Sequence, residues 1–178
     1  MCGIVGFLNH DIKNKASINK IKLLKNTIDH RGPDDNGQFI DNNLALGHTR
    51  LSIIDLKTGH QPMESYDDNY VITFNGEIYN YLEIKEELLK KNHIFLTKSD
   101  TEVILNSFIE WGTRCFEKFN GEWSVAIWDK KKKQLILCRD RYGIKPLYYF
   151  NNEENIIFSS EIKSFLSLYN LELDKNEL

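Results

Sequence analysis

The sequence predicts an α+β fold in which antiparallel β-sheets carry helices on their outer faces. Short strand-like stretches come in hairpin-sized clusters, and three amphipathic helical patterns lie between those clusters. Strands that alternated one for one with helices would favour a parallel, doubly wound sheet instead. The chain has 178 residues, of which 41% are apolar and 28% charged, and this length and composition suit one globular domain.

Strand-like stretches are runs of β-branched, aromatic and aliphatic residues bounded by turn residues. They are Gly3–Leu8, Leu44–His48, Leu51–Asp55, Tyr70–Phe74, Trp123–Trp128, Leu135–Cys138, Leu147–Phe150 and Ile156–Ser159. The lysine run Lys130–Lys133 lies between two of these stretches. We interpret this run as the solvated tip of a hairpin rather than as a binding patch.

The first two helical patterns are recognised by apolar residues that recur at helical spacing. Ser17 suits the N-cap of the first helix, in which the apolar positions are Ile18, Ile21, Leu24 and Ile28. The second helix is expected to run from about Tyr81 to Lys91, with Leu88 and Leu89 on its inner face.

The third helical pattern has clear signals at both ends. Ser99 is its expected N-cap, Glu102 stands where it would complete a capping box, and Gly112 ends the helix. Its inward-facing residues are expected to be Val103, Ile104, Phe108 and Trp111. A fourth, short helix is expected after Ser160.

Charge and hydropathy exclude several function classes. The 23 basic and 26 acidic residues leave a net charge of −3, which argues against general nucleic-acid or anionic-membrane binding. No run of about 18 apolar residues occurs, so we expect no membrane-spanning helix. The apolar stretch Ile4–Leu8 is not preceded by basic residues and ends at Asn9, which argues against a secretory signal.

The three cysteines, Cys2, Cys115 and Cys138, are too few for a disulfide framework. Neither they nor the histidines have a spacing typical of a metal site, so we expect no bound metal. A reducing, cytoplasmic setting is therefore expected. Cys115 and Cys138 lie in apolar stretches and are interpreted as buried structural residues, whereas Cys2 has an unusual position.

Cys2 would become the N-terminal residue if an aminopeptidase removed Met1, which happens readily before a small residue. One residue would then carry a thiol nucleophile and, in its α-amino group, the base that accepts the thiol proton. An α-amino group ordinarily has a pKa of about 7.7–8.0, which suits this task near neutral pH. The alternative is an ordinary cysteine at the start of a strand, and position alone does not decide between the two.

Several sequence blocks along the chain form a recognisable pattern. They are Met1–Phe7, His30–Asp35, Gly47–Asp55, Gln61–Met63, Phe74–Tyr81, Ser99–Glu102 and Arg139–Tyr149. In this order and at this spacing they resemble the glutaminase domain of class II glutamine amidotransferases, which are N-terminal-nucleophile hydrolases, in the branch found in glutamine-dependent asparagine synthetases. The resemblance covers nearly all of residues 1–178. It implies a four-layer αββα sandwich of two antiparallel sheets covered by helices.

The resemblance implies a catalytic role for three residues. Cys2 would attack the side-chain carboxamide of glutamine, release ammonia and leave a glutamyl thioester for water to hydrolyse. The side-chain amide of Asn75 and the backbone N–H of Gly76 would stabilise the oxyanion of the tetrahedral intermediate. Without the family resemblance, an Asn-Gly pair after a strand would indicate a type I′ hairpin turn.

The resemblance also implies binding groups of both signs, as a free amino acid requires. Arg50 would bind the α-carboxylate of glutamine through its planar fork of donors. Asp100 would pair with the α-ammonium group, assisted by Glu77, although Asp100 alone can also be explained as an acid that favours a helix N-terminus. Backbone atoms of three neighbouring residues would line the same pocket: Leu51, Ile53 and Ile54.

A C-terminal synthetase domain is expected to be absent from this chain, which has no glycine-rich phosphate-binding loop. The resemblance therefore implies that ammonia passes to an ATP-dependent synthetase domain or subunit, which would make asparagine from aspartate. ATP and Mg²⁺ are expected to be needed there, and no cofactor in the glutaminase domain. Relatives amidate other carboxylates, so the acceptor stays open, and a non-catalytic domain with the same fold is a further alternative.

Overall fold

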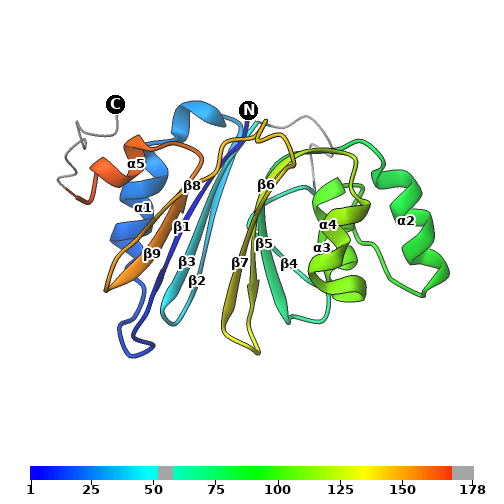
Figure 1. Ribbon diagram of the computed structural model, residues 1–178, viewed down its shortest axis with the longest axis horizontal. Helices are drawn as coiled ribbons and strands as arrows, with labels where there is room; N and C mark the ends of the chain where they lie inside the picture. The colour runs from blue at the N-terminus through cyan, green and yellow to red at the C-terminus, as the bar shows by residue number, and fades with distance from the viewer. Residues whose placement is uncertain (52–57, 170–178) are drawn as a thin grey trace.

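Two antiparallel β-sheets face one another in the computed structural model, which describes residues 1–51 and 58–169 (Figure 1). Within these residues, one sheet has the strand order β2-β3-β1-β9-β8 and the other has the order β4-β5-β6-β7. The strands of the first sheet are β1 (Gly3–Asn9), β2 (Asp35–Asp41), β3 (Leu44–Arg50), β8 (Tyr148–Asn151) and β9 (Asn155–Ser159). Those of the second are β4 (Met63–Glu64), β5 (Tyr70–Ile78), β6 (Gly121–Asp129) and β7 (Gln134–Arg139).

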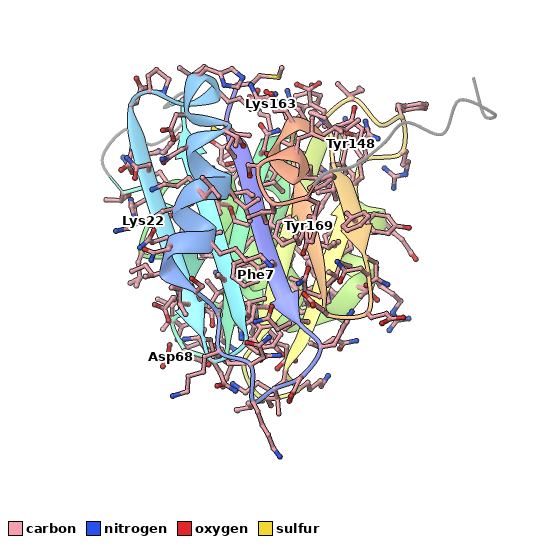
Figure 2. The ribbon with its side chains drawn as sticks, turned by 90° about the vertical axis from the view of Figure 1, so that its left-hand side faces the viewer. Phe7, Lys22, Asp68, Tyr148, Lys163 and Tyr169 are labelled. Carbon is pink, nitrogen blue, oxygen red and sulfur yellow. The ribbon has the colours of Figure 1, made fainter. Side chains whose placement is uncertain are left out.

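Helices cover both outer faces, so the expected four-layer αββα arrangement is confirmed (Figure 1). The first sheet carries α1 (Ile18–Asn26) and α5 (Lys163–Leu166), and Figure 2 shows both helices on the face of this sheet that is turned to the viewer, with Phe7 and Tyr169 on this side. The second sheet carries α2 (Tyr81–Lys90), α3 (Asp100–Trp111) and α4 (Cys115–Lys118). Two 3₁₀ turns, η1 (Asp29–Arg31) and η2 (Gly112–Arg114), complete the described elements.

Three apolar layers hold the sandwich together, and strand alternation decides which layer each side chain joins. On β1, Val5 and Phe7 pack under α1, while Ile4 packs between the two sheets. On β3, Leu44 and Leu46 also lie between the sheets. Side chains at even positions of β1 and β3 therefore point into the inter-sheet layer, including those at the ends of these strands.

Several local expectations are confirmed by the structure. The Ser17 hydroxyl caps α1 by accepting a hydrogen bond from the N–H of Lys20, and Gly112 ends α3 with φ at 59°. The short helix after Ser160 is α5. None of the described helices is long and apolar enough to cross a membrane. The lysine run forms the β6–β7 hairpin tip, but Lys130 and Lys133 are not simply solvated, since they form ion pairs with Glu64 and Asp41 respectively.

Other local expectations are wrong. Leu89 is 51% exposed, and Ile84 lies beside Leu88 on the buried face of α2, because residues four positions apart share one helix face. The capping box at α3 is only half formed: the Ser99 hydroxyl accepts from the N–H of Thr101, but Glu102 accepts from the N–H groups of Leu96 and Thr97 rather than from Ser99. Glu102 thus secures the preceding loop instead of the cap.

The strand assignments also need correction. β2 was not expected, because its sequence is polar and its edge position leaves most of its side chains at least partly exposed. β4 has only two residues, too few for a sequence pattern. The expected strand Leu51–Asp55 is not confirmed at Leu51, which follows the end of β3, and its remaining residues lie outside the described part. Cys115 is buried as expected, whereas Cys138 is only partly buried.

Trp128 provides a stability test of the inter-sheet layer. Its side chain is 0% exposed, and its indole Nε1 donates to the Asp41 carboxylate at 2.7 Å. Trp128→Ala is expected to lower the free energy of unfolding by about 3–5 kcal/mol, because it leaves a cavity between the sheets. Urea titration measures this loss. Trp128→Phe should cost less, and a loss below about 1 kcal/mol for the alanine variant would contradict this packing role.

Candidate active site

A pocket lies at the end of the sandwich where β1 begins and β3 ends, near the N-terminus (Figure 1). Most of the residues assigned from the sequence line this pocket: Cys2, Arg50, Leu51, Gly76, Glu77 and Asp100. They come from four separate segments, namely the start of β1, the end of β3, the second half of β5 and the start of α3. Ile53 and Ile54 lie outside the described residues.

Cys2 lies directly before β1 and has the same parity as Ile4, which points between the sheets. Its Sγ atom is 3.4 Å from both the N and the O atom of Leu51, so one backbone residue after β3 both donates to and accepts from the thiol. The carbonyl oxygen of Cys2 accepts a hydrogen bond from Nε of Arg31 at 2.9 Å. The thiol is therefore held at the pocket wall, while Cys2 remains partly exposed.

Asn75 is part of β5 and not of a turn, so the hairpin interpretation of the Asn-Gly pair is wrong. The β5–β6 register continues without interruption through Asn75↔Ser124 and Gly76↔Trp123. Val71 has the same parity as Asn75 and packs between the sheets, which places the Asn75 side chain in the layer toward which Cys2 points. Asn75 is 2% exposed, and its amide nitrogen is buried without a hydrogen-bond partner in the described structure.

The backbone of β5 presents a row of polar groups at its edge facing away from β6. On this edge the N–H of Phe74 donates to the Gln61 side chain, and the N–H of Ile78 donates to Asp100. Gly76 lies midway between them, so strand alternation points its N–H toward the same edge and the pocket. A Cβ at Gly76 would lie 2.1 Å from the carbonyl oxygen of Glu122, so only glycine fits here.

Residues of opposite charge line the pocket. Arg50 ends β3 and is 6% exposed, while Asp100 begins α3 and is 5% exposed. Burial raises the pKa of the Asp100 carboxyl to about 6, with a smaller contribution from the charge of Glu77, although backbone N–H groups of Ile78 and Thr101 oppose this rise. Asp100 thus lies at a helix N-terminus, as the simpler explanation required, and it also faces the pocket.

Sequence reasoning missed three residues that support this site. Gln61 lines the pocket. His48 is fully buried between the sheets, where burial lowers its pKa to about 3, and its Nε2–H donates to the carbonyl oxygen of Phe74 at 3.1 Å. Arg31 holds the backbone of Cys2. The sequence blocks include all three residues, but no local pattern shows which atoms they contact.

Arg31 is itself held by an acidic group. Its Nη1 is 3.0 Å from Glu161, which also pairs with His30 at 2.8 Å. Burial alone would raise the pKa of Glu161, but hydrogen bonds from Lys163, Arg31 and His30 lower it to about 2. Glu161 is therefore charged at neutral pH and ties the segment before α5 to the start of β1.

No metal-binding cluster accompanies this site. Among the residues that the structure describes, no group of three or more His, Cys, Asp or Glu side chains is arranged to hold a metal ion. The polar groups of the pocket are instead a thiol, an amide, backbone N–H groups, one arginine and two carboxylates. Such a set is suited to a small zwitterion that carries an electrophilic carbonyl group.

The αββα sandwich of this chain is also found in a solved amidotransferase structure. A solved structure of glutamine phosphoribosylpyrophosphate amidotransferase from B. subtilis matches with a TM-score of 0.77 over 93% of this chain and 43% of that one. The sequence identity is 20%, so this likeness concerns the fold.

The family model of the glutamine amidotransferase domain matches residues 1–178, and the chain belongs to this family. Asparagine synthetase [glutamine-hydrolyzing] 1 of Bacillus subtilis (strain 168) is 43% identical over 100% of this chain, which spans 29% of that relative. A putative asparagine synthetase [glutamine-hydrolyzing] 2 of Methanocaldococcus jannaschii is 42% identical over 99% of this chain and is covered to 37%. The chain thus spans about a third of these relatives.

Proposed function

We propose that this chain hydrolyses the side-chain amide of glutamine, with Cys2 as the nucleophile. One observation carries the proposal: a thiol, the backbone of Gly76 and residues of opposite charge line one pocket although four chain segments supply them, and the unpartnered amide of Asn75 lies in the adjoining layer between the sheets. Each group matches one part of glutamine, since the amino acid has a carboxamide, a carboxylate and an ammonium group. The test is ammonia release from glutamine by protein with and without Met1, of which only the processed form should be active.

The reaction requires the α-amine of Cys2, which is free only after Met1 is removed. This amine takes the thiol proton, and Sγ forms a bond to the amide carbon of glutamine. The oxyanion is held by Nδ2 of Asn75 and the N–H of Gly76. The carbon–nitrogen bond then breaks, the amine returns its proton to the leaving nitrogen, and ammonia departs. Water hydrolyses the thioester to glutamate and restores the thiol.

The two ends of glutamine are held by charge. Arg50 binds the α-carboxylate, and Asp100 binds the α-ammonium group with Glu77 beside it. Backbone atoms of Leu51 line this pocket, and we assign the same role to Ile53 and Ile54. No cofactor takes part in these steps.

The acceptor of the ammonia is proposed from the relatives. Because the matched relatives carry the name asparagine synthetase and are much longer, we propose that an ATP-dependent synthetase domain or subunit uses this ammonia, with Mg²⁺, to make asparagine from aspartate in the cytoplasm. The test is asparagine formation from glutamine, aspartate and ATP by the glutaminase together with its synthetase partner. Ammonia release without asparagine would favour a different carboxylate acceptor.

Asp100 makes glutamine binding depend on pH. With a pKa of about 6, its carboxyl loses the charge needed to pair with an ammonium group below that pH. Glutamine affinity is therefore expected to weaken by about tenfold per pH unit below pH 6. Calorimetric titration of the Cys2→Ala variant with glutamine measures this dependence without turnover.

Matched variants separate Asp100 from its neighbour. Asp100→Asn should bind glutamine weakly and without this pH dependence, whereas Glu77→Gln should retain it; an unchanged profile in Asp100→Asn would contradict the assignment.

The stability of the free protein depends on pH in the opposite direction from glutamine binding. Because the folded pKa is above the ordinary 3.8, the contribution of Asp100 to the free energy of unfolding falls as pH rises from 3.8 to about 6.

A further inference from the structure

Gln61 is a buried polar residue of the pocket wall to which glutamine hydrolysis assigns no step. Its side chain bridges β5 and α3, which are also joined further along by the hydrogen bond from the N–H of Ile78 to Asp100. Oε1 accepts the N–H of Phe74 on β5 at 2.6 Å, and Nε2 donates to Oγ1 of Thr101 on α3 at 3.2 Å. Gln61 is 5% exposed. The oxygen of the carboxamide is thus bound to the strand and its nitrogen to the helix.

This bridge occupies a place where, among the described residues, the second sheet has no strand beside the outer edge of β5. β4 has only two residues, which pair with Val71 and Ile72, so the outer edge of β5 lacks a strand partner from Phe74 onward. Side chains replace that strand at Phe74. Gln61 accepts its N–H, and the neutral imidazole of His48 donates to its C=O at 3.1 Å. The backbone N–H and C=O of Phe74 are therefore both held by side chains from outside the second sheet.

Phe74 directly precedes the two proposed oxyanion donors. A buried backbone N–H that loses its acceptor moves to find another, because leaving it unpaired costs about 1–3 kcal/mol. Such a movement at Phe74 would reorient the Asn75 side chain and the Gly76 N–H. At the other end, Thr101 follows Asp100 at the start of α3. The Gln61 carboxamide therefore connects the strand that carries the oxyanion donors to the helix end that carries Asp100, the proposed partner of the substrate ammonium group.

We propose that Gln61 is a positioning residue that sets the oxyanion donors of β5 at the correct distance from the substrate-binding end of α3. The proposal rests on the function proposed above. Gln61 does not touch the reacting atoms and acts through Phe74 and Thr101. Its effect belongs to the transition state, because only there does the oxyanion exist, while Arg50 and Asp100 bind the ground state equally well with or without it.

The test compares kcat and KM for ammonia release from glutamine by the processed protein. Gln61→Met keeps the length and volume but removes both hydrogen bonds, and its kcat is expected to fall by about 10- to 100-fold with KM changed by less than about threefold. Gln61→Glu restores an acceptor for Phe74 and is expected to recover most of kcat. Gln134→Met, on the exposed face of β7, is the control and should match the wild type.

Gln61→Asn shortens the amide by one methylene, so it cannot reach both partners, and it gives the same comparison if the methionine variant does not fold. A wild-type kcat in Gln61→Met, or in Gln61→Asn in its place, overturns the proposal, as does a rise of KM that accounts for the whole loss. An active wild type with unaffected variants overturns this inference alone. A wild type that releases no ammonia overturns the proposed function as well.

Discussion

Replacing Cys2 by alanine is expected to abolish ammonia release from glutamine, with a loss on the order of 10⁴–10⁶ in kcat. The reason is that no other described thiol lines the pocket: Cys115 is buried under the second sheet, and Cys138 lies on β7. Removing Sγ takes away the atom that forms the thioester, and the remaining donors cannot replace it. Ammonia is measured continuously with a coupled glutamate dehydrogenase assay.

Cys138→Ala is the matched control, because it removes a partly buried thiol away from the pocket and should retain wild-type activity. Intact-mass measurement after treatment with a glutamine-analogue electrophile provides a second readout. One adduct is expected on the processed wild type and none on Cys2→Ala. Equal ammonia release by wild type and Cys2→Ala would refute the nucleophile assignment, and full activity of protein that retains Met1 would refute the role of the α-amine.

Asn75→Ala is expected to lower kcat by about 10²–10³ while KM for glutamine changes little. The amide nitrogen of Asn75 is buried with no described hydrogen-bond partner, so in the free protein it is a donor kept for a group that arrives later. An oxyanion is such a group, and the carbonyl of the bound substrate is a weaker acceptor than the intermediate. Steady-state kinetics on glutamine separates kcat from KM.

Asn43→Ala is the control for losing a buried asparagine as such. Asn43 lies in the β2–β3 connection, which contains none of the residues that line the pocket. It is 6% exposed, and its amide donates to the carbonyl oxygen of Asn9. This variant should lose stability but keep kcat. If Asn75→Ala instead raises KM at unchanged kcat, Asn75 binds the ground state, and its assignment as an oxyanion donor is wrong.

Local elements were largely predictable because their signals lie within a few residues of one another. Ser17 and Gly112 mark helix ends through backbone geometry that depends on their immediate neighbours. Leu89 was misplaced because α2 buries only one narrow face, which takes Ile84 and Leu88, and the position of that face depends on what α2 packs against. β2 was missed because its polar sequence becomes a strand only through pairing with β3.

The residues that gather at the site were largely predictable, whereas the contacts that hold them were not. Cys2, Arg50, Asn75 and Asp100 were recognisable because each residue type suits one task and the motifs keep their order. The bridging role of Gln61 could not be read from its neighbours, because both of its partners lie in other elements. The same holds for His48, whose buried position follows from the stacking of one sheet on the other.

The sequence by itself determined the candidate site residues, most helix ends and the α+β class, because these depend on residue chemistry, motif order and short-range periodicity. Only the tertiary structure decided that Asn75 belongs to a strand, that its amide points into the layer shared with Cys2, and that Gln61 holds the strand beside it. The physical reason is that strand pairing brings together residues far apart in sequence, and strand alternation then assigns each side chain to one face.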